Sequence, residues 1–295
     1  MTPIGNRPVV FGVDSAQQDA ALAWAVDEAA RRRAPLHLVH AVLPVTHHVH
    51  GVVETAHHKE LRQLGDELLD KAVVRARERR PGLDVATFIT ESNPAQSLVS
   101  QSRHADLVVL GSRRLGRLAE MLSAYSTTVP VSANAACPVA VVPETEYTVE
   151  EPPYLVVGVD GSAAAEVALE HALTAAAARG AAVRAVWAWP RPLLGFLDER
   201  AAVEDFRGQL DAATAPLAAA HPDVPLSREL RRGHPVDVLA DAGRQALAVV
   251  VGRRGRGGFT GMRLGSVPHG LLHRAGCPVI TVPTSADATA GDGDS

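Results

Sequence analysis

Short apolar runs alternate with segments of helical spacing along the second half of the chain. Runs dominated by apolar residues predict buried strands at Leu155–Val159, Val183–Trp187, Leu247–Val251 and Pro278–Val282, with a weaker one at Leu226–Leu230. Apolar residues at i, i+3 and i+4 predict helices at Ala165–Arg179, Val203–Leu217, Pro235–Gln245 and Pro268–Arg274. Pro216 predicts a kink or an end of the second helix. Strands of this kind alternating with helices predict a parallel sheet covered on both faces.

The first half of the chain repeats this pattern. RPVVFGVDSAQQDAALAW matches PYLVVGVDGSAAAEVALEHA, and ACPVAVVP matches GCPVITVP, so Asp14 corresponds to Asp160 and Val39 to Val186. A repeat in the same order and spacing predicts a duplicated domain. We place domain 1 at residues 1–147 and domain 2 at 148–284, with a charged, proline-containing linker near Thr145–Pro153. The tail 285–295 lacks apolar periodicity and is predicted to be disordered.

Three turns of domain 2 are candidates for a binding site, because doubly wound sheets bind ligands at the carboxyl ends of their strands. Asp160-Gly161-Ser162 follows the first strand, and Val186-Trp187 ends the second. After the fourth strand comes Gly252-x2-Gly255-x9-Gly265-Ser266. Parallel strands bring these turns to one edge of the sheet, so we expect them to converge.

The residue types in these turns suit a nucleotide. Glycines let backbone N–H groups approach an anion, and a helix that begins near Ser266 offers unpaired N–H groups and a partial positive charge. Asp160 is placed to accept a hydrogen bond from a ribose hydroxyl. The arginines of this stretch can neutralise phosphate, although most are expected to face solvent: Arg253, Arg254, Arg256 and Arg263.

Two other phosphate-binding motifs are excluded. The sequence contains no GxxxxGK[ST], and domain 2 has no lysine. A GxGxxG pattern starting at Gly255 ends on Thr260 and follows the fourth strand, whereas the dinucleotide motif follows the first.

The pairing of GVDGS after a first strand with G-x2-G-x9-G-S after a fourth resembles the universal stress protein family. The tandem form resembles two-domain members of actinobacteria, and the match covers about Pro8–Pro143 and Pro153–Pro283. The resemblance implies an α/β fold: two tandem doubly wound domains, each a five-stranded parallel sheet of strand order 3-2-1-4-5. It implies ATP binding with Mg²⁺, pairing of the two domains through their last strands, and a homodimer.

The same resemblance assigns roles to residues of domain 2. It places Asp160, with its neighbour Gly161, and Val186 against the nucleoside. It places the glycine motif and the start of the following helix against the phosphates: Gly252, Gly255, Gly265, Ser266 and Val267.

Domain 1 departs from this motif. It has VDSA where domain 2 has VDGS, Arg114 where domain 2 has Gly255, and Tyr125 where domain 2 has Gly265. A tyrosine would crowd the approach of backbone to phosphate. Possible polar contacts survive at Asp14, Gly111, Ser126 and Thr127. We therefore expect domain 1 to bind ATP weakly or not at all.

Composition limits the classes of function. The chain has 295 residues and a net charge of −4, so no overall basic field favours nucleic acid. No apolar run is long enough for a membrane span, and the N-terminus lacks a signal pattern, so we expect a cytoplasmic protein. The only two cysteines, Cys137 and Cys277, lie far apart, which favours a reducing compartment and buried thiols.

The remaining polar residues predict no catalytic centre. Ser162 is interpreted as a helix cap rather than a nucleophile. The histidines at positions 47, 48, 50, 57 and 58 have no fixed ligand geometry for a metal. Trp187 and Trp189 either cover the site or pack in the core.

We expect an ATP-binding protein that regulates an unidentified protein partner under stress. Two alternatives stay open: an ATPase or nucleotidyl-transfer enzyme of related fold, and an interaction module that binds no nucleotide.

Overall fold

The computed structural model describes residues 7–14, 18–43, 56–112, 127–145, 147–189, 199–256 and 262–284. The chain divides into two compact units, unit 1 (Met1–Glu144) and unit 2 (Thr145–Ser295). The division falls three residues before the boundary predicted from sequence. The predicted disordered tail lies outside the described residues.

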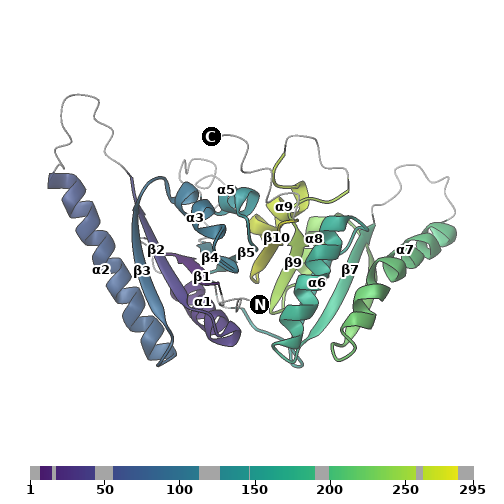
Figure 1. Cartoon of the computed structure of the whole chain (residues 1–295). Helices are drawn as coiled ribbons and strands as arrows, with labels where there is room; N and C mark the ends of the chain where they lie inside the picture. The colour runs from purple at the N-terminus through teal and green to yellow at the C-terminus, as the bar shows by residue number, and fades with distance from the viewer. Residues whose placement is uncertain are drawn as a thin grey trace, which may run out of the picture. The chain divides into compact units, whose positions relative to one another are not determined.

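Unit 1 alternates strands with helices along most of its length (Figure 1). Its strands are parallel and lie in the order β3-β2-β1-β4-β5. The described elements are β1 (Val9–Gly12), α1 (Asp19–Arg32), β2 (Leu36–Val42), α2 (Ala56–Arg79), β3 (Val85–Glu91), α3 (Pro94–Ser102), β4 (Leu107–Ser112), α5 (Thr128–Asn134) and β5 (Val139–Pro143).

Unit 2 repeats this topology, with the order β10-β9-β6-β7-β8. Its elements are β6 (Tyr154–Gly158), α6 (Ala163–Ala177), β7 (Ala182–Trp189), α7 (Glu199–Ala220), β8 (Leu226–Arg232), α8 (Pro235–Ala242), β9 (Ala248–Gly252), α9 (Ser266–Arg274) and β10 (Val279–Val282). Read from its third strand to its fifth, each sheet has the order 3-2-1-4-5, which confirms the predicted fold class.

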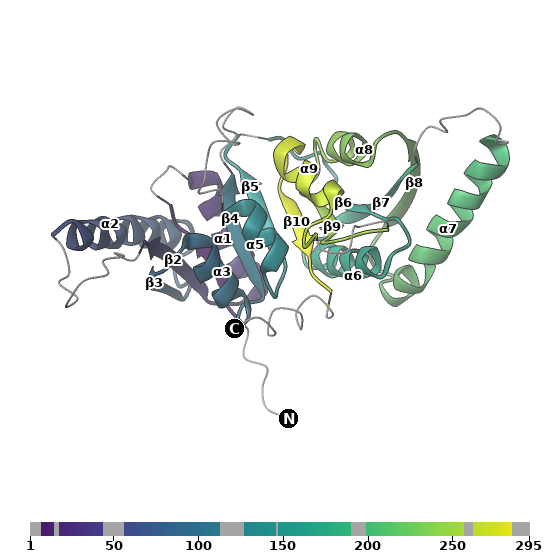
Figure 2. The same ribbon diagram turned by 90° about the horizontal axis from the view of Figure 1, so that it is seen from above.

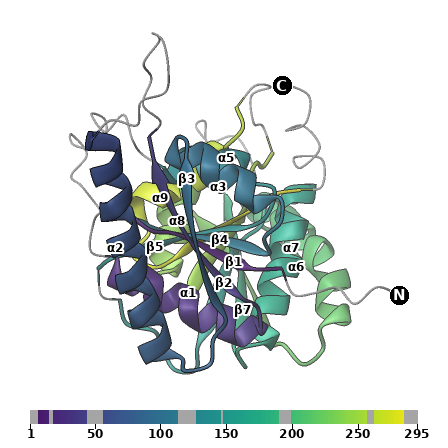
Figure 3. The same cartoon turned by 60° about the vertical axis from the view of Figure 1, so that its left-hand side comes forward.

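Helices cover both faces of each sheet. In unit 1, α1 packs on α2 on one face and α3 on α5 on the other (Figure 3). In unit 2, α8 and α9 lie together on one side of the strands and α6 lies on the other (Figure 2). The strands β4, β5, β6, β9 and β10 are almost wholly buried, as continuous apolar runs predict. None of the helices in the described ranges is long and apolar enough to cross a membrane.

The four predicted helices of unit 2 differ from the structure by up to four residues at an end, and two of these differences involve proline or glycine. Pro216 lies inside α7, which continues to Ala220 without ending at the proline. The helix expected over Pro235–Gln245 ends at Ala242, where Gly243 is the C-cap and its N–H donates to the Leu239 carbonyl. Glycine is a poor helix former, and this accounts for the early end.

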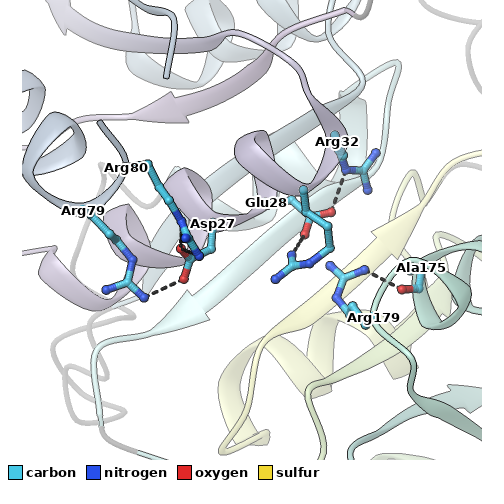
Figure 4. Close-up of polar contacts among 8 residues, drawn as sticks. Asp27, Glu28, Arg32, Arg79, Arg80, Ala175 and Arg179 are labelled. Atoms are coloured by element: carbon cyan, nitrogen blue, oxygen red, sulfur yellow. Dashed lines mark hydrogen bonds and ion pairs between the residues drawn. The ribbon is translucent and has the colours of Figure 1, made fainter. Parts of the chain in front are cut away.

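Acidic residues near the end of α1 organise the arginines around them (Figure 4). Asp27 accepts hydrogen bonds from Arg79 at 2.5 Å and Arg80 at 3.0 Å, which ties α1 to the end of α2. Glu28 is 1% exposed and pairs with Arg31 and Arg32 of its own helix, each at 2.6 Å. A buried carboxylate is tolerated when cations and donors surround it, as they do here.

Because Asp27 forms these ion pairs, its protonation changes the free energy of unfolding. Burial would raise the pKa of the Asp27 carboxyl, but hydrogen bonds and charges from Arg79 and Arg80 outweigh burial and lower that pKa from 3.8. A carboxyl whose pKa is lower in the folded state stabilises the fold above its unfolded pKa. That contribution is lost as the pH falls through the folded pKa.

We expect Asp27→Asn to lower the free energy of unfolding by about 1 kcal/mol at neutral pH, because the arginines are partly exposed and screened. The difference from wild type should narrow once the pH falls below about 4. Urea unfolding of both proteins at neutral and acid pH measures it. A difference that stays constant between the two conditions contradicts the ion-pair origin.

Candidate functional site

The turn after β6, residues Asp160–Ser162, is shaped by its own side chains. Asp160 Oδ1 accepts hydrogen bonds from the Ser162 N–H at 3.0 Å and the Ser162 hydroxyl at 2.6 Å. Ser162 Oγ in turn accepts from the Ala165 N–H at 3.2 Å, so the predicted helix cap is confirmed. Gly161 has a φ of +74°, a conformation that side-chain-bearing residues rarely adopt.

The glycine turn, residues Gly252–Arg256 at the end of β9, returns to the same aspartate. The Arg256 N–H donates to Asp160 Oδ2 at 2.8 Å. A Cβ on Gly255 would collide with that same oxygen. A Cβ on Gly252 would lie 2.7 Å from the Ala164 carbonyl oxygen at the start of α6. Packing against backbone therefore requires glycine at position 252, whereas a side chain at position 255 would have to displace the Asp160 carboxylate.

Gly265, the third glycine of the motif, is different. It is the N-cap of α9, with φ −69° and ψ 163°, and its N–H donates to the Arg253 carbonyl at 2.9 Å. The nearest atom to a Cβ placed on Gly265 is that carbonyl oxygen, at 3.5 Å, which is an ordinary contact. Neither backbone strain nor packing in the protein itself requires glycine at this position.

The N-terminus of α9 presents backbone donors beside the glycine turn. The N-cap, Gly265, has no side chain with which to cap this helix end. Ser266 and Val267 are its first residues, whose N–H groups have no acceptor within a helix, and Pro268 has no N–H at all. Ser266 is exposed. This end of α9 can therefore offer N–H groups and a partial positive charge to an anion.

The arginines of the motif divide into buried and exposed groups. Arg254, Arg256 and Arg263 are exposed, in agreement with the expectation that most face solvent. Arg253 is 3% exposed, and its backbone N–H continues the sheet by donating to the Val282 carbonyl. Arg256 Nη1 donates to Gln209 Oε1 of α7 at 3.2 Å, so the glycine turn is also connected to α7.

In β7, the backbone groups that lack a partner strand lie beyond Val186. Val186 is 1% exposed, and its carbonyl already accepts from the Val159 N–H at 3.0 Å. The pairing of β6 with β7 ends where Gly158 lies opposite Val186, but β7 continues to Trp189. The Trp189 carbonyl accepts from Gly233, on the β8 side. Backbone groups alternate sides along a strand, so those of Ala188 point past the end of β6.

Sequence reasoning missed Ala188 because it ended this strand at Trp187. The structure thus shifts the accessible polar backbone by two residues, from Val186 to Ala188. The signal in the sequence was the continuation of the apolar run through Trp189.

Aromatic side chains pack beneath the turn after β6 and against α7. Trp187 and Trp189 are 4% and 6% exposed, and their ring centroids lie 6.1 and 6.0 Å from that of Phe206 on α7. The Trp187 ring also reaches to 3.1 Å from the position of a Cβ on Gly161. Both tryptophans therefore pack in the core, and Trp187 additionally lies under the first turn.

The corresponding edge of unit 1 is built differently. The Asp14 N–H donates to Gln18 Oε1 at 3.0 Å, and Glu144 Oε2 accepts from the Ala20 N–H at 3.2 Å. A Cβ on Gly111 would lie 3.0 Å from Glu144 Oε1 and 3.1 Å from Gln18 Nε2. Thr127 is the N-cap of α5 but its side chain does not cap the helix. Arg114, Tyr125 and Ser126 lie outside the described residues.

The remaining candidates form no second centre in the described ranges. Cys137 and Cys277 are buried free thiols, as expected. His58 is 6% exposed and lies 3.5 Å from the Glu91 carboxylate, while residues 47, 48 and 50 and the side chain of residue 57 are outside the described structure. Within those ranges, no three histidine, cysteine or acidic side chains gather closely enough to hold a metal ion.

The fold and the two turns agree with a comparison against known protein families. The model of the universal stress protein family matches residues 5–143 and 154–283. The chain belongs to the universal stress protein family.

Universal stress proteins similar to this chain come from mycobacteria. One from Mycobacterium tuberculosis (strain H37Rv) is 35% identical over 298 residues, covering 96% of this chain and 99% of the relative. One from Mycolicibacterium smegmatis is 34% identical, covering 93% and 96%. The crystal structure of a universal stress protein from Archaeoglobus fulgidus has a TM-score of 0.70 at 15% identity, covering 95% and 97%. That structural likeness supports the fold.

Two motif glycines of this universal stress protein, Gly255 and Gly265, are predicted to differ in their effect on stability. Gly255→Ala should lower the free energy of unfolding of unit 2 by roughly 1–3 kcal/mol, because the new methyl group displaces the Asp160 carboxylate. Gly265→Ala should cost less than about 1 kcal/mol, since only a weaker N-cap is introduced. Urea unfolding followed by tryptophan fluorescence measures both. Equal losses in the two variants contradict the packing difference.

Proposed function

We propose that this universal stress protein binds ATP in unit 2 and that the bound nucleotide regulates a protein partner under stress. Gly265 carries the proposal. Gly252 and Gly255 are explained by contacts within the protein, whereas Gly265 has space for a Cβ and, as the N-cap of α9, has no side chain to cap that helix. A ligand that approaches the backbone closely supplies the missing reason for a glycine there.

The phosphates would bind at the glycine turn and the start of α9. The N–H groups of Ser266 and Val267, together with the helix dipole, suit a polyphosphate. The backbone of Gly252 and Gly255 would form the other side of this cradle, whereas the Arg253 N–H and carbonyl are already bonded to Val282 and Gly265. Exposed arginines of the motif lie close enough in sequence to neutralise charge. Mg²⁺ would be held mainly by the phosphates and water, as it is in many nucleotide sites.

The nucleoside would lie across the ends of β6 and β7. Asp160 Oδ1 already accepts two hydrogen bonds, whereas Oδ2 accepts one and has a second lone pair that can accept from a ribose hydroxyl. Gly161, exposed beside it, leaves the approach open. The backbone of Ala188, rather than that of Val186, would meet the edge of the adenine ring.

The arrangement favours binding and regulation over catalysis. Asp160 holds backbone and hydroxyl donors from two turns, which makes it a positioning group rather than a free general base. Ser162 is committed to capping α6. A regulator in the cytoplasm, pairing its domains through their last strands and its chains as a homodimer, stays a prediction from the family resemblance.

Nucleotide content and binding test the proposal. We expect purified protein, or protein titrated with ATP and Mg²⁺ in a calorimeter, to bind about one ATP per chain. Gly265→Tyr should weaken binding at least about tenfold because the side chain fills the phosphate approach. Gly265→Ala should weaken binding less, with little change in stability.

Gly208→Ala is the matched control. Gly208 lies on α7, and a Cβ there meets nothing within 4 Å, so this variant should bind ATP as wild type does. Failure of the wild-type chain to bind any adenine nucleotide contradicts the proposed site. Multiple turnover of ATP by pure protein would favour the enzyme alternative over a regulatory one.

A further inference from the structure

Two polar side chains occupy the carboxyl edge of unit 1. Glu144 directly follows β5, and Gln18 directly precedes α1. Both approach Gly111 near the end of β4, where a Cβ would lie 3.0 Å from the Glu144 carboxylate and 3.1 Å from the Gln18 amide. Gln18 also accepts the Asp14 N–H, so it spans from the first strand to the fourth.

Glu144 already supplies an anion to this edge. Its carboxylate accepts from the Ala20 N–H in the first turn of α1, at 3.2 Å. The start of a helix is a preferred place for a negative charge, because its N–H groups lack acceptors and carry the positive end of the dipole. A polyphosphate at the end of β4 would therefore meet a like charge where the fold otherwise offers a positive one.

Unit 2 has no such pair at the corresponding positions. The repeat aligns Glu144 with Thr284 and Gln18 with Ala165. In unit 2 the backbone of Ala164, inside α6, packs directly on Gly252. In unit 1 the described helix begins at Asp19, which aligns with Glu166, three residues into α6. The side chains of Glu144 and Gln18 thus lie where unit 2 has the first turn of its helix.

We propose that Glu144 and Gln18 exclude polyphosphate from unit 1, so that the chain holds one nucleotide site and one edge occupied by its own residues. The proposal rests on the proposed ATP site of unit 2. It assigns the asymmetry to two side chains outside the glycine motif. Arg114 and Tyr125, the departures visible within that motif, are then insufficient by themselves to account for the difference between the two units.

Restoring the unit 2 residues to unit 1 tests this assignment. We would compare Tyr125→Gly with the triple variant Tyr125→Gly/Glu144→Thr/Gln18→Ala by calorimetric titration with ATP and Mg²⁺. Tyr125→Gly alone should keep the wild-type stoichiometry. The triple variant should bind one more ATP per chain than wild type does.

The charge of Glu144 is separated from its bulk by Tyr125→Gly/Glu144→Gln. Glutamine can still accept the Ala20 N–H, so the start of α1 is preserved, and circular dichroism melting verifies the fold of every variant. We expect this variant to bind a second ATP at least about tenfold more weakly than the triple variant does. The increase in ATP binding of this variant over Tyr125→Gly alone measures the contribution of the Glu144 charge.

Two results would overturn the proposal. One is a second ATP bound by Tyr125→Gly with Glu144 and Gln18 in place. The other is a folded triple variant that binds no more ATP than wild type. A wild-type chain that binds no ATP counts against the unit 2 site, whereas the gain in the triple variant is judged separately.

Discussion

The carboxylate of Asp160 is the group on which the unit 2 site depends. One oxygen fixes Ser162 and, through it, the start of α6, while the other fixes the Arg256 N–H in the glycine turn. These two turns belong to strands that are neighbours in the sheet but almost a hundred positions apart in sequence. Without a carboxylate at this position, the turn after β6 and the turn after β9 would lose the hydrogen bond from the Arg256 N–H to Asp160. Glycine at position 255 leaves room for this hydrogen bond, because a Cβ there would collide with the Asp160 carboxylate.

Duplication of a domain preserved the sheet and let its edge diverge. Both units have the same strand order, and both have an aspartate at the end of the first strand. In unit 2 the aspartate joins two turns of backbone. In unit 1 the backbone of Asp14 instead bonds to Gln18, and Glu144 meets the first turn of α1. The core of a parallel sheet constrains apolar residues strongly, whereas polar residues at the strand ends are free to change the chemistry of the edge.

Local patterns in the sequence predicted most of the fold and part of the site. Strands with continuous apolar runs and the serine at the start of α6 were recognisable because their physical cause is local. Glu144 was not recognisable, since its contact with Ala20 joins residues 124 positions apart and neither belongs to the motif. Arg253 was included among the candidate phosphate contacts, but its backbone N–H and carbonyl are bonded to Val282 and Gly265, contacts that only the fold reveals. The position of Ala188 depended on how far β7 outruns β6, which only the strand register reveals.

Arg256 connects the proposed site to α7. Its backbone N–H bonds to Asp160 and its side chain bonds to Gln209 on α7. The same helix packs Phe206 against both tryptophans of β7. A ligand that bonds to Asp160 would therefore contact the same carboxylate as the turn that is bonded to α7, and α7 presents many exposed residues to solvent. An exposed hydrogen bond of this kind contributes little free energy, so any coupling between the proposed site and α7 through Arg256 would be small and reversible.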